Sequence, residues 1–193
     1  MPFVSKLETK SVCRMAILAA LYVLLTMVSI RAGNLHITFA SLPVVASALL
    51  FGPGEAAVTA LLGEFLNQML SYGFTLTTGL WLIPPAVRGL VVGVCAARFW
   101  KTGKPLENRP AAYYLACVVG ALATTACNTA VIWLDSVIYH YYTPAYVFGD
   151  TLLRLVTGMT TAICVATVAM PVARLLRRTR LVPSLLGGVG DER

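Results

Sequence analysis

Polar and charged side chains interrupt several of the long apolar stretches of this 193-residue chain, and they gather toward one end of each stretch. The candidates for binding chemistry are Glu64, Asn67, Gln68, Tyr72, Trp81, Arg88, Asn128, Trp133 and Arg154. Guanidinium groups bind carboxylates through paired hydrogen bonds, amides can hydrogen-bond to a heterocycle, and tryptophan or tyrosine rings can stack on it. This set of residue types predicts a pocket for a small polar ligand.

The spacing of these residues predicts that they converge. Glu64, Asn67, Gln68 and Tyr72 recur at i, i+3, i+4 and i+8, which places them on one face of a helix. A charge near the middle of a bilayer costs on the order of 2.5 to 3.5 kcal/mol, so Arg88 is expected to face the interior of a helix bundle or a wet cavity. We therefore expect a cavity that is open at one end of the bundle and closed at the other.

A purely structural explanation of the same residues is also open. Arg88 could pair with Glu64, and Arg154 with Asp150, so that buried ion pairs hold the helices in register. Such pairs have no reason to gather at one end of the helices, which favours the pocket.

The composition determines what kind of fold positions these residues. Hydrophobic residues make up 58% of the chain and charged residues 12%, and the mean hydropathy is +0.78. Soluble domains carry about 25% charged residues. The uncharged stretches are long enough for helices to cross about 30 Å of hydrocarbon. The chain is predicted to be an all-α membrane protein, with one membrane domain over residues 1–180 and a short mobile tail over 181–193.

Six transmembrane helices are expected in this bundle. Their predicted ranges are 15–30, 37–51, 55–72, 79–99, 111–138 and 146–176. The turn Phe51-Gly52-Pro53-Gly54 separates the second helix from the third, and Pro84-Pro85 kinks the fourth or delays its regular start. A bundle of this size leaves no room for an ATPase domain, so any energy source is expected on another polypeptide.

Lysine and arginine residues predict the orientation, because short loops rich in them stay in the cytoplasm. Twelve of the fifteen lie before the first helix, at the end of the fourth or between it and the fifth, or at the end of the sixth or after it: Lys6, Lys10, Arg14, Arg98, Lys101, Lys104, Arg109, Arg174, Arg177, Arg178, Arg180 and Arg193. Both termini are therefore expected on the cytoplasmic side of a cell membrane, and the polar residues listed first are expected toward the outer side.

Other kinds of chemistry have little support in the sequence. The five cysteines form no C-x-x-C pair and lie in or beside apolar segments, so neither a metal site nor a disulfide is expected. The chain contains no H-E-x-x-H or G-x-S-x-G motif, which argues against an intramembrane enzyme, and we expect no cofactor. A structural or assembly subunit without a ligand stays open as an alternative.

Two pairs of small residues have the spacing that lets helices approach closely in lipid. Gly89 and Gly93 are expected to pack inside the bundle. Ala16 and Ala20, in the first helix, could either pack inside the bundle or contact a partner protein, and the sequence favours neither.

These features together resemble the substrate-binding S components of energy-coupling factor (ECF) transporters, the vitamin-uptake systems of prokaryotes. The segments that carry the likeness are Ala16-x-x-x-Ala20 in a basic-flanked first helix, Leu50-Phe51-Gly52-Pro53 with Ala56 and Gly63 following, and Thr75-x-Thr77-Thr78 leading to Pro84, Arg88 and Gly89. The likeness covers about residues 12–175.

The resemblance implies a function and a set of partners. Such a protein captures a vitamin at the outer face, docks on a transmembrane coupling subunit through the Ala16 and Ala20 face, and reorients in the bilayer while two ATPase subunits drive the cycle. It also implies that residues 31–38 cap the pocket, with Asn34 and His36 as candidate ligand contacts.

The resemblance also bears on the ligand. Residues 74–93 look most like the folate branch of the family, in which case Arg88 and Arg154 would hold a glutamate tail while Trp81 and Tyr72 stack on a pterin ring. Pantothenate, which is smaller and has a single carboxylate, is the close rival. Cobalamin and a queuosine precursor also stay open.

Overall fold

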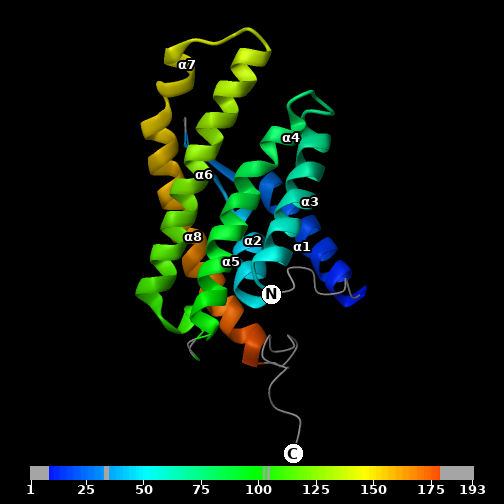
Figure 1. The fold of residues 1–193 in the computed structure, drawn as a ribbon, viewed down its shortest axis with the longest axis vertical. Coiled ribbons are helices and arrows are strands. Elements are labelled where there is room, and N and C mark those ends of the chain that lie inside the picture. Colours follow the sequence, from blue (N-terminus) through cyan, green and yellow to red (C-terminus); the bar gives the residue numbers. More distant parts are fainter. Residues whose placement is uncertain (1–8, 33–34, 102, 104, 179–193) are drawn as a thin grey trace, which may run out of the picture.

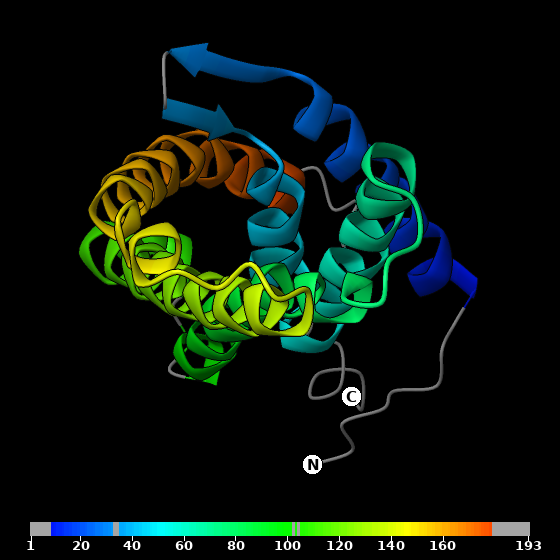
Figure 2. The ribbon, with the colours of Figure 1, turned by 90° about the horizontal axis from the view of Figure 1, so that it is seen from above.

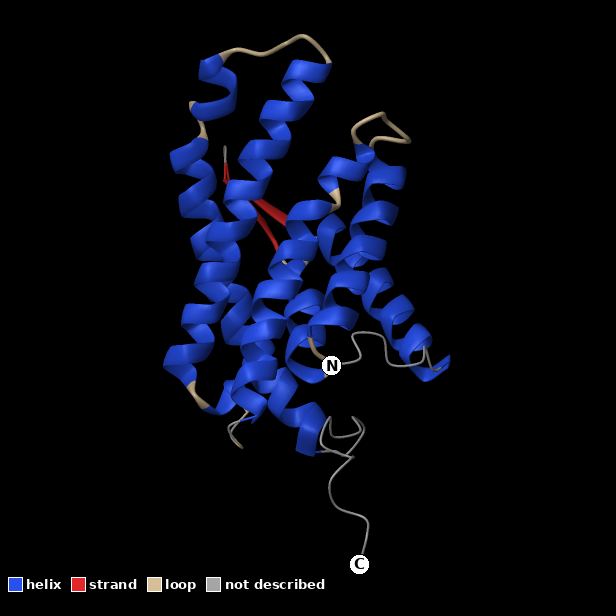
Figure 3. Ribbon diagram, viewed as in Figure 1, coloured by secondary structure: helices blue, strands red, loops and turns tan. Residues whose placement is uncertain are grey.

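The structure is a computed structural model that describes residues 9–32, 35–101, 103 and 105–178. Its elements are α1 (Thr9–Met27), β1 (Ser29–Ala32), β2 (Leu35–Thr38), α2 (Ser41–Leu50), α3 (Pro53–Ser71), α4 (Thr78–Trp81), α5 (Ile83–Lys101), the 3-10 helix η1 (Leu106–Asn108), α6 (Pro110–Ile138), α7 (Pro144–Phe148) and α8 (Thr151–Arg178). The long helices run along one common direction (Figure 1, Figure 3) and surround a common axis when seen from above (Figure 2). The predicted helical-bundle fold is confirmed.

Four helical stretches of the described chain are long and apolar enough to cross a membrane. They are Thr9–Met27, Thr78–Lys101, Pro110–Ile138 and Pro144–Arg177. The other two predicted spans also form helices, but α2 has only 10 residues and α3, with 19, is less apolar because of its polar face. Many large apolar side chains on the long helices are exposed, such as Ile17, Leu115 and Leu152, as expected for surfaces that face lipid.

A short β-hairpin replaces the predicted start of the second helix. Residues 29–32 and 35–38 pair antiparallel, with Ser29 opposite Thr38 and Arg31 opposite His36. The β-branched residues Ile30, Ile37 and Thr38 favour strands over helix. The predicted helix boundaries at residues 30 and 37 were therefore wrong: α1 ends at Met27 and α2 begins at Ser41.

Two of the predicted spans are broken near one end of the bundle. α4 and α5 are separated at Leu82, and Pro84 and Pro85 occupy the first turn of α5, where the missing N–H groups cost no helical hydrogen bond. The interruption at Leu82, directly before the proline pair, agrees with the prediction that these prolines kink this helix or delay its regular start. The predicted continuous helix over 146–176 is instead divided into α7 and α8 by Gly149 and Asp150.

The opposite end of the bundle, which we call the closed end, is tightly packed. Its core cluster includes seven alanines from α2, α3, α5, α6 and α8: Ala48, Ala56, Ala96, Ala116, Ala166, Ala169 and Ala173. A Cβ atom on Gly93 would lie 2.5 Å from the Cα of Pro53, and one on Gly89 would lie 3.0 Å from the carbonyl carbon of Ala56. The predicted internal packing of both glycines is confirmed, because α5 approaches α3 too closely there for any side chain.

Two ion pairs of the described chain lie at the closed end. Among the described residues, the ion pairs are Arg177–Glu107 at 2.7 Å and Arg14–Glu55 at 2.9 Å. Glu107 is 1% exposed, and the Arg177 guanidinium also lies 3.8 Å above the ring of Trp100 and donates a hydrogen bond to the Leu49 carbonyl oxygen. This contact set joins the end of α8 to η1, α5 and α2.

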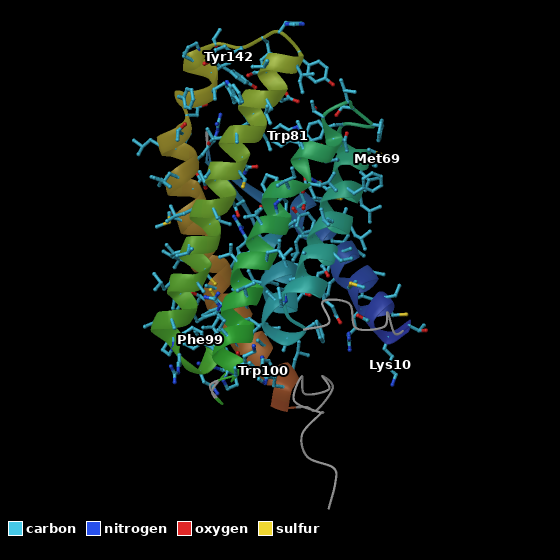
Figure 4. The ribbon with its side chains drawn as sticks, viewed as in Figure 1. Lys10, Met69, Trp81, Phe99, Trp100 and Tyr142 are labelled. Carbon is cyan, nitrogen blue, oxygen red and sulfur yellow. The ribbon has the colours of Figure 1, made fainter. Side chains whose placement is uncertain are left out.

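The beginning of α1 and the end of α8 both lie at the closed end. Figure 4 labels Lys10, Phe99 and Trp100 there, whereas Trp81 and Tyr142 lie toward the other end, which we call the open end. The side of the membrane that each end faces stays a prediction from the basic residues. The division into a domain over 1–180 and a tail over 181–193 also stays a prediction, since residues 179–193 lie outside the described part of the chain.

Candidate ligand-binding site

A cavity of about 350 Å³ lies between α1, α2, α3, α5 and α6 toward the open end. We call it the amide lobe, after Asn67, Gln68 and Asn128, which line it. The other lining residues are Tyr22, Thr26, Thr38, Ala40, Ser41, Val44, Glu64, Tyr72, Trp81, Pro84, Pro85, Arg88 and Thr124. A wall of amides, one carboxylate, one guanidinium and a tryptophan ring can bind a flat, hydrogen-bonding ring.

Glu64 is held in the wall of the amide lobe by three neutral donors. Its carboxylate accepts hydrogen bonds from Tyr22 Oη at 2.7 Å, from Gln68 Nε2 at 2.8 Å and from Asn67 Nδ2 at 3.4 Å. Gly63 makes this possible, because a Cβ there would lie 2.7 Å from the Tyr22 ring. The network fixes the positions of the amides around a buried acid.

A second cavity, of about 390 Å³, adjoins the first and is lined from α5, α6 and α8. We call it the arginine lobe, after Arg88 and Arg154. Its other lining residues are Thr38, Thr124, Thr125, Asn128, Asp150, Leu153, Thr157, Gly158 and Thr161. Arg88, Asn128, Thr38 and Thr124 line both cavities, so a ligand in one reaches residues of the other.

The two arginines of this lobe have neutral partners in the described structure. Arg88 Nε donates a hydrogen bond to Thr124 Oγ1 at 3.3 Å, and Arg154 Nη1 donates one to the carbonyl oxygen of Val147 at 3.1 Å. With five threonine hydroxyls around them, the guanidinium groups suit a carboxylate or another oxyanion.

A third cavity, of about 360 Å³, lies at the outermost part of the open end. We call it the tyrosine lobe; it is lined by Gln68, Tyr72, Thr75, Thr77, Trp81, Asp135, Tyr139, Tyr141 and Tyr146. It shares Gln68, Tyr72 and Trp81 with the amide lobe. The Tyr141 hydroxyl donates a hydrogen bond to Asp135, and this bond raises the pKa of Tyr141 well above its usual value, which keeps the hydroxyl protonated.

The ion pairs of the structural explanation are absent from the described residues. Arg88 does not pair with Glu64, and Arg154 does not pair with Asp150, because the described ion pairs are both at the closed end. The charged groups of the open end are therefore not joined to one another as the structural explanation requires; their described partners are neutral groups.

The structure brings most of the predicted site residues together. Glu64, Asn67, Gln68, Tyr72, Trp81, Arg88 and Asn128 all line the amide lobe, and Arg154 lines the arginine lobe. Trp133 does not join them: this residue is 45% exposed and lines none of the three lobes. Asn34 lies outside the described residues, and for His36 in β2 only the backbone is described.

Several lining residues were missed by the sequence analysis. Tyr22 on α1 and Ser41 and Val44 on α2 line the amide lobe, although α1 and α2 showed no polar face. A lone tyrosine in the middle of an apolar helix was the available signal for Tyr22. Tyr141 and Tyr146 were not among the predicted site residues, and both line the tyrosine lobe.

Comparison with protein families gives a match over residues 6–176 to the model of the ECF-type riboflavin transporter S component. The chain belongs to this family. The S component is therefore a membrane-embedded, substrate-binding subunit of a vitamin transporter and not an enzyme. A comparison with curated proteins found no match.

Solved structures of other S components have the same fold. One, described in a study of the structure and mechanism of the S component of a bacterial ECF transporter, aligns with a TM-score of 0.57 at 17% identity, over 89% of this chain and 95% of that one. ThiT from Listeria monocytogenes aligns with a TM-score of 0.58 at 16% identity, over 88% and 93%. At such low identity the likeness shows the shared fold alone.

Proposed function

We propose that this S component captures a water-soluble vitamin with a flat heteroaromatic ring and a polar tail. The ring would lie in the amide lobe, between Trp81 and the amides, and the tail would extend into the arginine lobe. The observation that carries the proposal is that Arg88 lines both lobes while forming no ion pair with a described residue. Its charge is thus free to bind a ligand.

Two vitamins are the first candidates, each for a different reason. Riboflavin is favoured by the family model, which is named for riboflavin transport. Folate, the ligand expected from the resemblance of residues 74–93, is favoured by the second arginine, because its tail carries carboxylates and the riboflavin tail carries only hydroxyl groups. The comparisons give folate no support of their own. Pantothenate has a carboxylate but no aromatic ring to fill the amide lobe.

Mass spectrometry of ligand carried through purification from vitamin-rich medium tests the proposal directly. We expect one of the vitamins to copurify and to quench tryptophan fluorescence in titrations of the ligand-free protein. If properly folded protein binds no vitamin at all, the proposal is contradicted and a structural or assembly role is favoured.

The variant Arg154→Ala separates the two candidate vitamins. If the ligand is folate, this change removes a charge-assisted hydrogen bond and lowers its affinity by about tenfold to a hundredfold. If the ligand is riboflavin, which has no carboxylate, the affinity changes little.

We further propose that the open end faces the outside and that α1 docks on a transmembrane coupling subunit, with two ATPase subunits supplying the energy. Ala16 and Ala20 are exposed on α1, whereas Met15, Ala19, Tyr22 and Val23 are buried against the bundle. An exposed pair of small residues one turn apart permits close approach of a partner helix. Ala16→Trp and Ala20→Trp are expected to leave vitamin binding intact and to abolish uptake in cells. Uptake at the wild-type rate would show that the docking face lies elsewhere.

A further inference from the structure

The tyrosine lobe differs in charge and composition from the other two cavities. Five of its nine lining residues are aromatic: Tyr72, Trp81, Tyr139, Tyr141 and Tyr146. Its ionisable acid, Asp135, is 8% exposed, and no Lys, Arg or His is among the described residues that line the lobe. Aromatic faces and a buried carboxylate together attract positive charge.

Two helix ends add to the negative potential of this lobe. α3 ends at Ser71 and α6 ends at Ile138, and the residues that follow them, Tyr72 and Tyr139, line the lobe. The C-terminus of a long helix carries a partial negative charge that acts over its last turn. Side chains and helix dipoles therefore have the same sign here.

The arginine lobe has the opposite sign. It holds two guanidinium groups against one carboxylate, the exposed Asp150, and it lies at the beginning of α8, where the helix dipole is positive. Asn128 of the arginine lobe and Asp135 of the tyrosine lobe are seven residues apart on α6, which is about 10 Å along the helix axis. An elongated ligand of vitamin size can reach both lobes.

We infer that the tyrosine lobe is a subsite for a positively charged or N–H-rich group, such as a quaternary ammonium, a protonated amine or the amino-substituted edge of a heterocycle. The inference rests on the proposed function in one respect, namely that one vitamin extends across the three lobes. The group would lie against the aromatic rings, where an N–H group would donate to the oxygen of Asp135 that Tyr141 does not occupy and a quaternary ammonium, which has no N–H, would be held by its charge alone. The cavity would then select a dipolar ligand, with its donor end at Asp135 and its anionic end at Arg88 and Arg154.

The lobe can be tested alone with choline and its uncharged isostere 3,3-dimethylbutan-1-ol, which has the same shape. Saturation-transfer NMR on the purified protein in detergent measures the binding of each probe. We expect choline to bind and the alcohol to bind at least about tenfold more weakly, since aromatic faces and a carboxylate discriminate by charge. Asp135→Asn should lower the affinity for choline by about tenfold. Glu55→Gln, the same charge change at the closed end, should leave this affinity unchanged.

The outcomes distinguish this inference from the proposed function. Equal binding of choline and the alcohol, or no choline binding at any concentration at which the protein stays folded, overturns the cation subsite even if a vitamin binds. If Asp135→Asn does not fold, Tyr141→Leu takes its place, because it removes one ring of the lobe and leaves the acid. This variant must then lower the affinity for choline. Unchanged choline affinity in a folded variant of either kind would also overturn it. Failure of the wild-type protein to bind any vitamin contradicts the proposed function and leaves the choline result valid.

Discussion

At the closed end of the bundle, the buried carboxylate of Glu107 lies 2.7 Å from Arg177, whereas at the open end Arg88 donates to the neutral hydroxyl of Thr124 at 3.3 Å. Both ends thus place charge inside a membrane protein, but only the closed end neutralises it with an ion pair of the described chain. Around Gly93 the backbones of α5 and α3 approach too closely for a side chain, although one cavity of about 260 Å³ lies nearby between Phe51 and Trp100. Three cavities lie at the open end.

This difference shows that the closed end mainly stabilises the fold and that the open end is arranged for binding. A paired buried charge fastens helices together, and removing one partner is costly. An unpaired arginine beside a cavity lowers the stability of the protein until an anionic or polar group of a ligand binds to it. This arrangement is expected of a binding site. Substitutions at the closed end should therefore change stability, and those at the open end should change affinity.

The largest stability effect is expected for Glu107→Ala. The change leaves the Arg177 guanidinium without its carboxylate in the interior and should lower the free energy of unfolding by about 3–5 kcal/mol, measured by reversible unfolding in detergent with SDS. Glu55→Ala is the control, because the Arg14–Glu55 pair is partly exposed and its loss should cost about 1 kcal/mol or less. Equal effects of the two variants would show that burial does not set the strength of these pairs.

Packing at the closed end is tested by Gly93→Ala. Its methyl group would lie 2.5 Å from the Cα of Pro53, so α3 and α5 must separate, at a cost of about 1–3 kcal/mol in unfolding free energy. Gly79→Ala, which has nothing within 4 Å of its added Cβ, is the matched control and should cost little or stabilise slightly. A stable Gly93→Ala protein would mean that the helices can move apart freely.

At the open end, Arg88→Ala should lower the affinity for the copurifying vitamin by about 1–3 kcal/mol, measured by fluorescence titration, because a charge-assisted hydrogen bond is lost. Its unfolding free energy should change much less than that of Glu107→Ala. Arg98→Ala, the same substitution at the other end of α5, is expected to bind as the wild type does. Full affinity in Arg88→Ala would contradict the assignment of this residue to the binding site.

The smallest effect is expected for Tyr22→Phe. It removes the 2.7 Å hydrogen bond to Glu64 and should cost about 0.5–1.5 kcal/mol of unfolding free energy, with a similar or smaller loss of affinity through displacement of Asn67 and Gln68. Tyr114→Phe, whose hydroxyl bonds to Thr167 at an exposed site, should cost less. If the two variants lose the same unfolding free energy, Glu64 does not depend on Tyr22 for its position.

Much of the site was predictable because helical periodicity carries information about faces. The spacing of Glu64, Asn67 and Gln68 predicted one polar face of α3, and the cost of burying Arg88 predicted that it faces the interior. Trp133 shows the limit of this reasoning. It is close in sequence to Asn128, but five residues along a helix bring it to a different side, and its exposure was visible only in the packed structure.

The sequence by itself determined that this chain is a membrane-embedded helical bundle, roughly where its helices lie, and that Gly89 and Gly93 pack inside it, although α1 begins six residues before its predicted start at residue 15. These properties follow from local composition and helical periodicity, which can be read without knowing which residues are close in space. The tertiary structure alone decided that Tyr22 holds Glu64, that residues 29–38 form a hairpin, and that the arginines avoid the predicted ion pairs. It also decided that Asp135 and the tyrosines after α6 enclose a cavity, because such contacts depend on how distant segments meet.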